Sequence, residues 1–263
     1  MNTYILKHAG LAIFAVVVLG LVIWYMAINP APTVYNRSTA TTTPAVTGQA
    51  THITEDATYY TVDAQYPSTI SFPLASNASA GANAVSVMKK WNEDVIAEFK
   101  KNGNFDNLSH DDVQMLRLDQ RKYELMTEYE VRTGPKTVTY VYSNFEDTGG
   151  AHPNTFYRTF TFDVSTGKEL SISDLFVPGS EYLSTLSTIA RADLPGIEGD
   201  YTNPEFITDG TKPVVESFQN FYFEGSQLVI VFPPYQVGPY VLGVVKLPIE
   251  RSRLADVLAT QYR

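Results

Sequence analysis

The stretch 148–154, with the sequence Thr-Gly-Gly-Ala-His-Pro-Asn, separates two segments that are predicted to be neighbouring strands. These segments, 137–145 and 155–164, are rich in β-branched and aromatic residues. The two adjacent glycines permit positive φ and close backbone approach, and Pro153 favours extended geometry at the residue before it. The stretch therefore predicts a specifically shaped loop, and it contains His152, one of four histidines in the chain.

The remaining periodicities predict an α+β domain. Apolar residues at steps of three or four form one stripe along a helix at 82–101, which Gly103 is expected to end. A second helix is predicted at 181–194, with Pro195 and Gly196 as its stop, and a short terminal helix at 251–258. Further strands are predicted at 59–66, 123–131, 220–224, 227–232 and 241–247. We expect an antiparallel sheet with helices packed on one face.

The N-terminal region predicts a membrane anchor. Residues 9–28 contain no charge, and twenty apolar residues in a helix span about 30 Å, the thickness of the bilayer's hydrocarbon core. Lys7 precedes this segment, so the positive-inside rule predicts a cytoplasmic tip at 1–8 and an extracytoplasmic remainder. A cleaved signal peptide is the alternative, although the segment is long for one. Residues 29–56 are rich in Thr, Ala and Pro and predict a flexible stalk before a domain at 57–263.

The cysteine content and net charge of the sequence limit the partners that the protein can bind. There is no cysteine, so disulfides and thiolate metal sites are excluded. The net charge is −9; from residue 51 onward it is 17 − 28 = −11, because two of the 19 basic residues and none of the 28 acidic ones precede that point. Such a surface disfavours nucleic acid and suits a cationic partner, although surplus acid also serves simple solubility.

Two loops contain the candidate binding residues. Gly149, Gly150, His152 and Asn154 lie in the first loop. Tyr235 and Tyr240 lie in a second, proline-rich loop at 233–240, where they could stack on a sugar or a protein, or pack over the sheet edge.

Glu146, Asp147 and Asp163 are close to His152 in sequence, which would suit acid–base chemistry if they also met in space. The alternative is a loop whose polar groups bond its own backbone. The spacing of the histidines predicts no metal site, and we expect no cofactor and assign no catalytic residue.

Several of these motifs together resemble a known family. The stretch 148–154, Phe162-Asp163, Thr166-Gly167-Lys168, the run Ser-Asp-Leu-Phe at 173–176 and the run Phe-Pro-Pro-Tyr-Gln-Val-Gly-Pro-Tyr at 232–240 are similar to the RsiV-type extracytoplasmic domain. The resemblance covers roughly 57–262 and implies a bacterial cell-envelope domain of α+β fold. In RsiV-type anti-sigma factors such a domain binds lysozyme, and in PdaC-type peptidoglycan deacetylases it accompanies a separate catalytic module.

The departures from this family narrow the expected function. Residues 1–8 are too few to bind a sigma factor, and the paired histidines of a deacetylase module are missing. We therefore expect a membrane-anchored extracytoplasmic binding module that recognises peptidoglycan or a cationic protein such as lysozyme, with the bilayer contacted through 9–28 and no nucleic acid bound. The alternative is an envelope glycan hydrolase or deacetylase-related enzyme that uses the glycine loop.

Overall fold

The computed structural model describes residues 49–72 and 75–263, and its central element is the strand β4 (Thr137–Asp147). β4 pairs antiparallel with β3 (Tyr123–Gly134) and with β5 (Asn154–Asp163). The first six residues of β4 are all buried, on both faces of the strand, because each face of the sheet is covered there. The predicted strand pair around 148–154 is confirmed.

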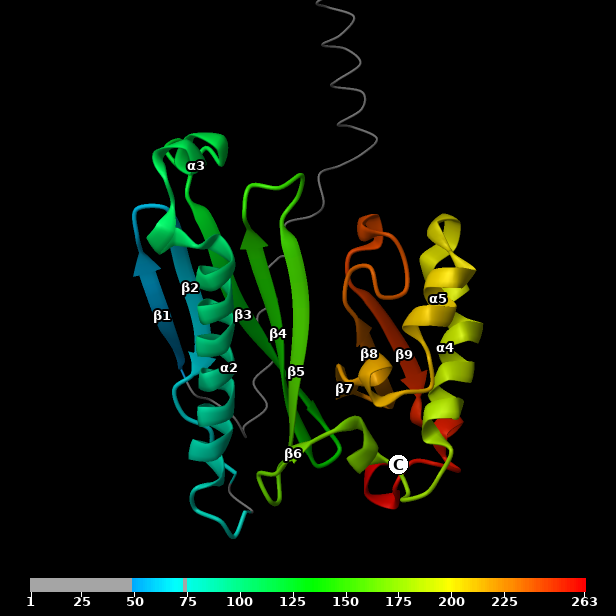
Figure 1. The fold of residues 1–263 in the computed structure, drawn as a ribbon. Helices are drawn as coiled ribbons and strands as arrows, with labels where there is room; N and C mark the ends of the chain where they lie inside the picture. Colours follow the sequence, from blue (N-terminus) through cyan, green and yellow to red (C-terminus); the bar gives the residue numbers. More distant parts are fainter. Residues whose placement is uncertain (1–48, 73–74) are drawn as a thin grey trace, which may run out of the picture. The chain divides into compact units, whose positions relative to one another are not determined.

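The first sheet has the order β1–β2–β3–β4–β5–β6, with β1 (Ala50–Asp56), β2 (Tyr60–Pro67) and β6 (Glu169–Leu170) completing it (Figure 1). β2 and β3 run parallel, so the prediction of a purely antiparallel sheet is wrong. The reason is the helix between them: α2 (Ala80–Gly103) returns the chain to the starting end of the sheet, as a parallel pair requires.

Helix α2 confirms the predicted apolar stripe and covers one face of this sheet. Its buried Ala84 and Met88 belong to the same core cluster as the β4 and β5 aromatics, and the Trp91 ring lies 4.9 Å from that of Tyr142. The helix includes Gly103, and Asn104 adopts the left-handed C-cap conformation (φ 47°) with its N–H bonded to the Lys100 carbonyl.

A second sheet of three strands, β7 (Phe221–Glu224), β8 (Gln227–Phe232) and β9 (Val245–Glu250), follows in the described chain. Helix α4 (Tyr182–Glu198) packs on it, and Leu186, Leu194, Ile230 and Leu247 share one buried cluster. The prediction of one sheet with helices on one face is therefore also wrong, because the C-terminal strands form their own sheet with its own helix.

The two sheets contact each other through the faces that their main helices leave free. Val141 of the first sheet is buried with Tyr222 and Val229 of the second. At this contact the Thr159 N–H donates to Asn220 Oδ1 (3.0 Å), and the Thr161 hydroxyl donates to the Phe221 carbonyl (3.3 Å). α2 and α4 thus lie on the two outer sides of a pair of sheets, as Figure 1 shows.

Two of the boundary errors occur at prolines. α4 continues through Pro195 to Glu198, and β9 contains Pro248. Pro248 is tolerated because β9 pairs with β8 alone in the described sheet, so no second ladder needs its missing N–H. The predicted terminal helix is instead the 3₁₀ turn η6 (Arg251–Leu254).

The remaining short elements connect these layers. They are the helices α3 (His110–Met115) and α5 (Pro204–Gly210) and the 3₁₀ turns η1 (Phe105–Asn107), η2 (Ile172–Leu175), η3 (Gly199–Tyr201), η4 (Val215–Phe218), η5 (Tyr240–Leu242) and η7 (Thr260–Tyr262).

The domain begins earlier than predicted. Ala50–Asp56, assigned to the stalk from its composition, forms β1 and pairs along its length with β2. Its alternating burial shows why a strand forms there: every second residue lies against the domain. The predicted tip, the anchor at 9–28 and the first part of the stalk lie outside the described residues. No helix within residues 49–72 and 75–263 combines the length and the apolar character that crossing a bilayer requires.

Candidate functional site

The β4–β5 loop, residues 148–153, is shaped by Gly149. Gly149 has φ +80°, and its N–H donates to the Asp147 carboxylate (2.8 Å). Gly150 does not adopt positive φ, and a side chain there would meet little besides the His152 carbonyl oxygen at 3.7 Å. The unusual backbone geometry expected of the glycine pair is thus confined to its first member.

The two loops predicted to bind come together in space. The His152 ring stacks on the Tyr240 ring, with centroids 3.8 Å apart and an interplanar angle of 18°. The Tyr240 hydroxyl donates to the Pro153 carbonyl (2.8 Å), and the Tyr235 hydroxyl lies 3.2 Å from His152 Nε2. We call His152, Tyr235 and Tyr240 the aromatic cluster. It joins residues more than eighty positions apart at one edge of the domain.

The hydrogen bonds of His152 indicate its tautomer. Nδ1 lies 3.0 Å from the Pro153 carbonyl oxygen, which can accept but cannot donate. Nδ1 is therefore assigned the proton, and in this tautomer Nε2 is placed to accept from the Tyr235 hydroxyl. Neither nitrogen has a carboxylate as its hydrogen-bond partner in the described structure, so the ring is oriented for stacking rather than for a carboxylate-assisted proton transfer.

Tyr235 holds its place in the cluster at a conformational cost. Its φ is +69°, uncommon for a bulky residue, and its side chain is 52% exposed. The neighbouring Gln236 fixes the loop, because its side-chain amide donates to the carbonyls of Gly210 and Ser217 (2.9 Å each). A strained, exposed aromatic residue on a firmly held loop is typical of a functional position.

A hollow with a volume of about 670 Å³ adjoins the other flank of the glycine loop. We call it the arginine hollow, after the two cationic side chains in its wall. Its lining residues are Met115, Leu116, Arg117, Gln120, Arg121, Tyr123, Thr148, Gly149 and Gly150. The sequence predicted the glycines but not the wall from the α3–β3 connection. The capping pair Ser109 and Asp112, whose side chains bond each other's backbone N–H, was the available signal that a short helix begins there.

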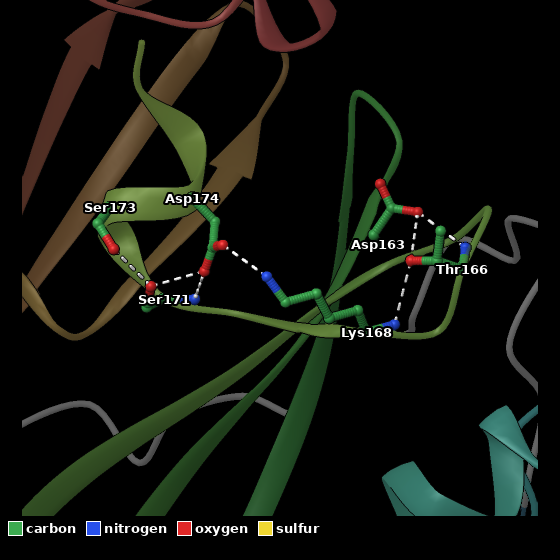
Figure 2. A network of polar contacts seen from close by, with 6 residues as sticks. All are labelled: Asp163, Thr166, Lys168, Ser171, Ser173 and Asp174. Atoms are coloured by element: carbon green, nitrogen blue, oxygen red, sulfur yellow. Dashed lines mark hydrogen bonds and ion pairs between the residues drawn. The ribbon is translucent and has the colours of Figure 1, made fainter. Parts of the chain in front are cut away.

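The nearby carboxylates do not assemble around His152. Burial, reinforced by the negative charge of Glu98, raises the pKa of Glu146, while Asp147 turns back onto the Gly149 N–H. Asp163 lies at the opposite end of β5, about 30 Å away along a ten-residue strand. There its carboxylate accepts bonds from Ser165 and from Thr166, the second of which Figure 2 shows. The prediction that Asp163 lies close to His152 is wrong, because the full length of β5 separates the two residues.

In the described structure, the Asn154 side chain makes no hydrogen bond or ring contact with the aromatic cluster. It is the first residue of β5, it is exposed, and its backbone pairs with Glu146 in the ladder. In the described residues, no group of three or more His, Asp or Glu side chains lies close enough together to hold a metal ion. What the site offers chemically is a stacked aromatic cluster, with His152 and Tyr235 exposed and Tyr240 half-buried, beside a cationic hollow.

The fold and site define a two-sheet α+β domain with a loop-built aromatic edge, and comparison with known proteins shows which families and structures it is similar to. Residues 173–252 match the family described as Protein of unknown function (DUF3298). A solved DUF3298 family member from Bacteroides fragilis has the same fold, with a TM-score of 0.55 and 17% identity over 82% of this chain and 95% of that one. These matches confirm the predicted resemblance to the RsiV/PdaC-type domain.

Two curated relatives share part of the chain. It is 28% identical to the peptidoglycan-N-acetylmuramic acid deacetylase PdaC of Bacillus subtilis over 73% of this chain and 39% of PdaC. It is also 28% identical to the esterase Rv3036c of Mycobacterium tuberculosis over 42% of this chain and 47% of the esterase. The match spans less than half the length of either relative.

Proposed function

We propose that this protein is an extracytoplasmic binding module of the bacterial cell envelope, anchored in the cell membrane through 9–28, and that peptidoglycan is its ligand. The observation that carries the proposal is the aromatic cluster, in which two loops distant in sequence present rings at one edge of the domain.

The cluster has the properties of a glycan-binding surface. Aromatic side chains combine a flat apolar face with a polar atom at one end, so they can pack against the carbon face of a sugar and bond its hydroxyls. Tyr235 is half exposed, and its hydroxyl already contacts His152. Such a prearranged set loses little side-chain freedom on binding, which favours affinity. The relative PdaC is a deacetylase of peptidoglycan, which supports the same ligand.

A cationic protein such as lysozyme is the second candidate, and the charge of −11 from residue 51 onward favours it. Complementary charge raises the rate of encounter and is screened by salt. The same charge argues against nucleic acid. Catalysis by the glycine loop has less support, because both ring nitrogens of His152 are directed at Tyr235 and Pro153.

The test is co-sedimentation of the purified protein with insoluble peptidoglycan. We expect Tyr235→Ala/Tyr240→Ala to weaken binding at least about tenfold, since well-packed aromatic contacts each contribute on the order of 1–2 kcal/mol. Tyr201→Ala is the matched control: Tyr201 is also 52% exposed, but it lies in η3 and outside the cluster. Equal binding by the wild type and the double variant would overturn the assignment of this surface.

A parallel titration with lysozyme at low and high salt separates the two candidates. Peptidoglycan binding that depends on the cluster supports the proposal. Lysozyme binding that weakens with salt, together with no binding to peptidoglycan, would replace the ligand with a cationic protein. The proposed topology is tested by adding protease to intact cells: the domain should be released, and a fully protected domain would contradict an extracytoplasmic location.

A further inference from the structure

The arginine hollow carries positive charge, whereas the domain around it has a negative net charge. Its lining includes Arg117 and Arg121 and no carboxylate, whereas the chain from residue 51 onward carries a surplus of eleven acidic residues. Arg117 is exposed, and no ion pair in 49–72 or 75–263 involves its guanidinium. An uncompensated cation in the wall of a concave surface attracts anions.

Arg117 occupies a backbone conformation that does not favour its side chain. After α3, the Arg117 N–H bonds to the Gln114 carbonyl and the Leu118 N–H bonds to the Val113 carbonyl, the two bonds of a Schellman motif. Arg117 occupies the left-handed position of this motif, with φ +55°, where glycine is the intrinsically favoured residue. The arginine is therefore not the residue that the backbone favours here, and its side chain lines the hollow.

The second arginine, Arg121, packs against the backbone of the glycine loop at Gly149. A Cβ on Gly149 would lie 2.4 Å from Arg121 Nη2, so the absence of a side chain leaves room for the guanidinium beside the loop backbone. Asp147 lies 3.5 Å from the same nitrogen, which holds the guanidinium loosely. Arg121 thereby stands beside Gly149 at the hollow, with Arg117 also in the wall.

We propose that the arginine hollow binds a compact anionic group, a carboxylate or a phosphate, carried by an envelope polymer. Planar guanidinium groups recognise both anions through paired N–H donors. The inference deepens the proposed function and rests on it for the polymer: Gly150 of the hollow and His152 of the cluster are two residues apart, about 7 Å of chain at most. A glycan on the aromatic cluster could therefore place a charged substituent in the hollow.

The experiment is calorimetric titration of the purified full chain in non-ionic detergent with three probes. These are a disaccharide-tetrapeptide fragment of peptidoglycan, the same fragment with its carboxylates amidated, and inorganic phosphate. We expect the carboxylate form to bind at least about tenfold more tightly than the amide, the effect of losing one charge-assisted hydrogen-bonded contact. Arg117→Gly and Arg121→Gln should each reduce this preference.

The controls separate binding from folding and from bulk charge. Arg117→Gly should leave the melting temperature unchanged or higher, because glycine suits the left-handed position, while it weakens anion binding. Lys122→Gln removes a neighbouring charge whose side chain pairs with Asp56 and does not line the hollow, so it should keep the carboxylate preference.

The outcomes distinguish this inference from the proposed function. Equal binding of both fragments, or a preference unchanged in Arg117→Gly and Arg121→Gln, would overturn the anion site while leaving a peptidoglycan module intact. Phosphate binding that needs Arg117, without binding of either fragment, would support the anion site, assign its source to a phosphate polymer and overturn peptidoglycan as the ligand. Binding of none of the three probes would contradict both.

Discussion

Asp147 with Gly149 stands at one end of the β4–β5 pair, and Asp163 with Gly167 stands at the other. Both glycines have positive φ, and both aspartates accept a backbone N–H two residues further on. The ends differ in what surrounds this shared motif. Near Asp147 the rings of the aromatic cluster and the arginine hollow face outward, whereas around Asp163 the polar groups bond one another.

The second end, residues 163–174, is a closed network (Figure 2). Asp163 accepts bonds from the backbone and hydroxyl groups of Ser165 and Thr166, at 2.5–3.0 Å. Asp174 accepts from Lys168 Nζ (2.7 Å) and from the Ser171 N–H (2.8 Å). An Asp–Gly loop is thus a structural element in itself, and the side chains around it that make no other contact decide whether it can also bind a ligand.

The largest expected effect concerns the glycines. At Gly167, alanine would add strain at φ +70° and place its Cβ 2.4 Å from Ala80 Cβ, so Gly167→Ala should lower the free energy of unfolding by about 2–4 kcal/mol. Gly149→Ala should cost about 1–2 kcal/mol, because the atom it meets is the movable end of Arg121. Gly225→Ala measures the cost of the backbone strain alone, because Gly225 has φ +55° and a side chain there would meet open space. Chemical denaturation measures all three, and equal losses would contradict the packed character of the closed end.

The next effect concerns the carboxylates. Burial alone would raise the pKa of Asp163, but the bonds from Ser165 and Thr166 hold that pKa below its ordinary value. A lowered pKa means that the stabilisation is present above about pH 4 and is lost as pH falls through the folded-state value. Asp163→Ala should therefore cost about 1–2 kcal/mol at pH 7 and progressively less at acidic pH. Denaturation from pH 3 to 7 tests this, with Asp147→Ala expected to show the smaller loss.

Glu198 lies beside Gly238 of the proline-rich loop, and its contribution to stability should depend on pH in the opposite direction. Its side chain is 3% exposed, and neither oxygen has a hydrogen-bond partner within the described structure. Burial raises its pKa, and the backbone N–H of Asn203 offsets this in part without reaching hydrogen-bond geometry. The protonated form is favoured in the fold, so stability is fully present below the unfolded pKa and is lost as pH rises through the folded value.

Glu198→Gln imitates the protonated side chain, so we expect it to raise the free energy of unfolding by about 1 kcal/mol at pH 7 and to change little below about pH 4. Melting temperatures measured across this range provide the test. A destabilised Glu198→Gln variant at pH 7 would show that the ionised carboxylate has a partner that stabilises it.

The smallest effect on stability belongs to His152. His152 is exposed, and its contacts are one stacked ring and two surface hydrogen bonds. His152→Ala should change the free energy of unfolding by less than about 1 kcal/mol, while ligand binding weakens. A large loss of stability in a thermal melt would make His152 part of the domain's structural support and remove it from the binding surface.

The sequence predicted the strands around 148–154, the helix stripe of α2 and both candidate loops, because each depends on local periodicity and turn chemistry. It could not predict that His152 and Tyr240 stack, since two loops meet only through the packing of the two sheets. The parallel pairing of β2 and β3 was in principle accessible, because a long helix lies between them.

Other errors came from treating local rules as decisive. Asp163 was grouped with His152 by closeness in sequence, although a full strand separates them. Pro195 was taken as a stop, although the last turn of α4 contains it, and the strand predicted at 241–247 continues through Pro248 because an edge strand tolerates proline. Arg117 was not recognised, since its left-handed backbone depends on the end of α3, a helix too short to show a clear period.

Hydrogen–deuterium exchange of the protein, with and without a soluble peptidoglycan fragment, tests most directly whether the Asp147 end of the β4–β5 pair is the binding surface. The account predicts slower exchange at 148–153 and 233–243 on addition of the fragment, and no change at 163–174. Tyr235→Ala/Tyr240→Ala should abolish the slowing. Protection that appears at 163–174, or that is absent from both loops while the fragment binds, would contradict the account.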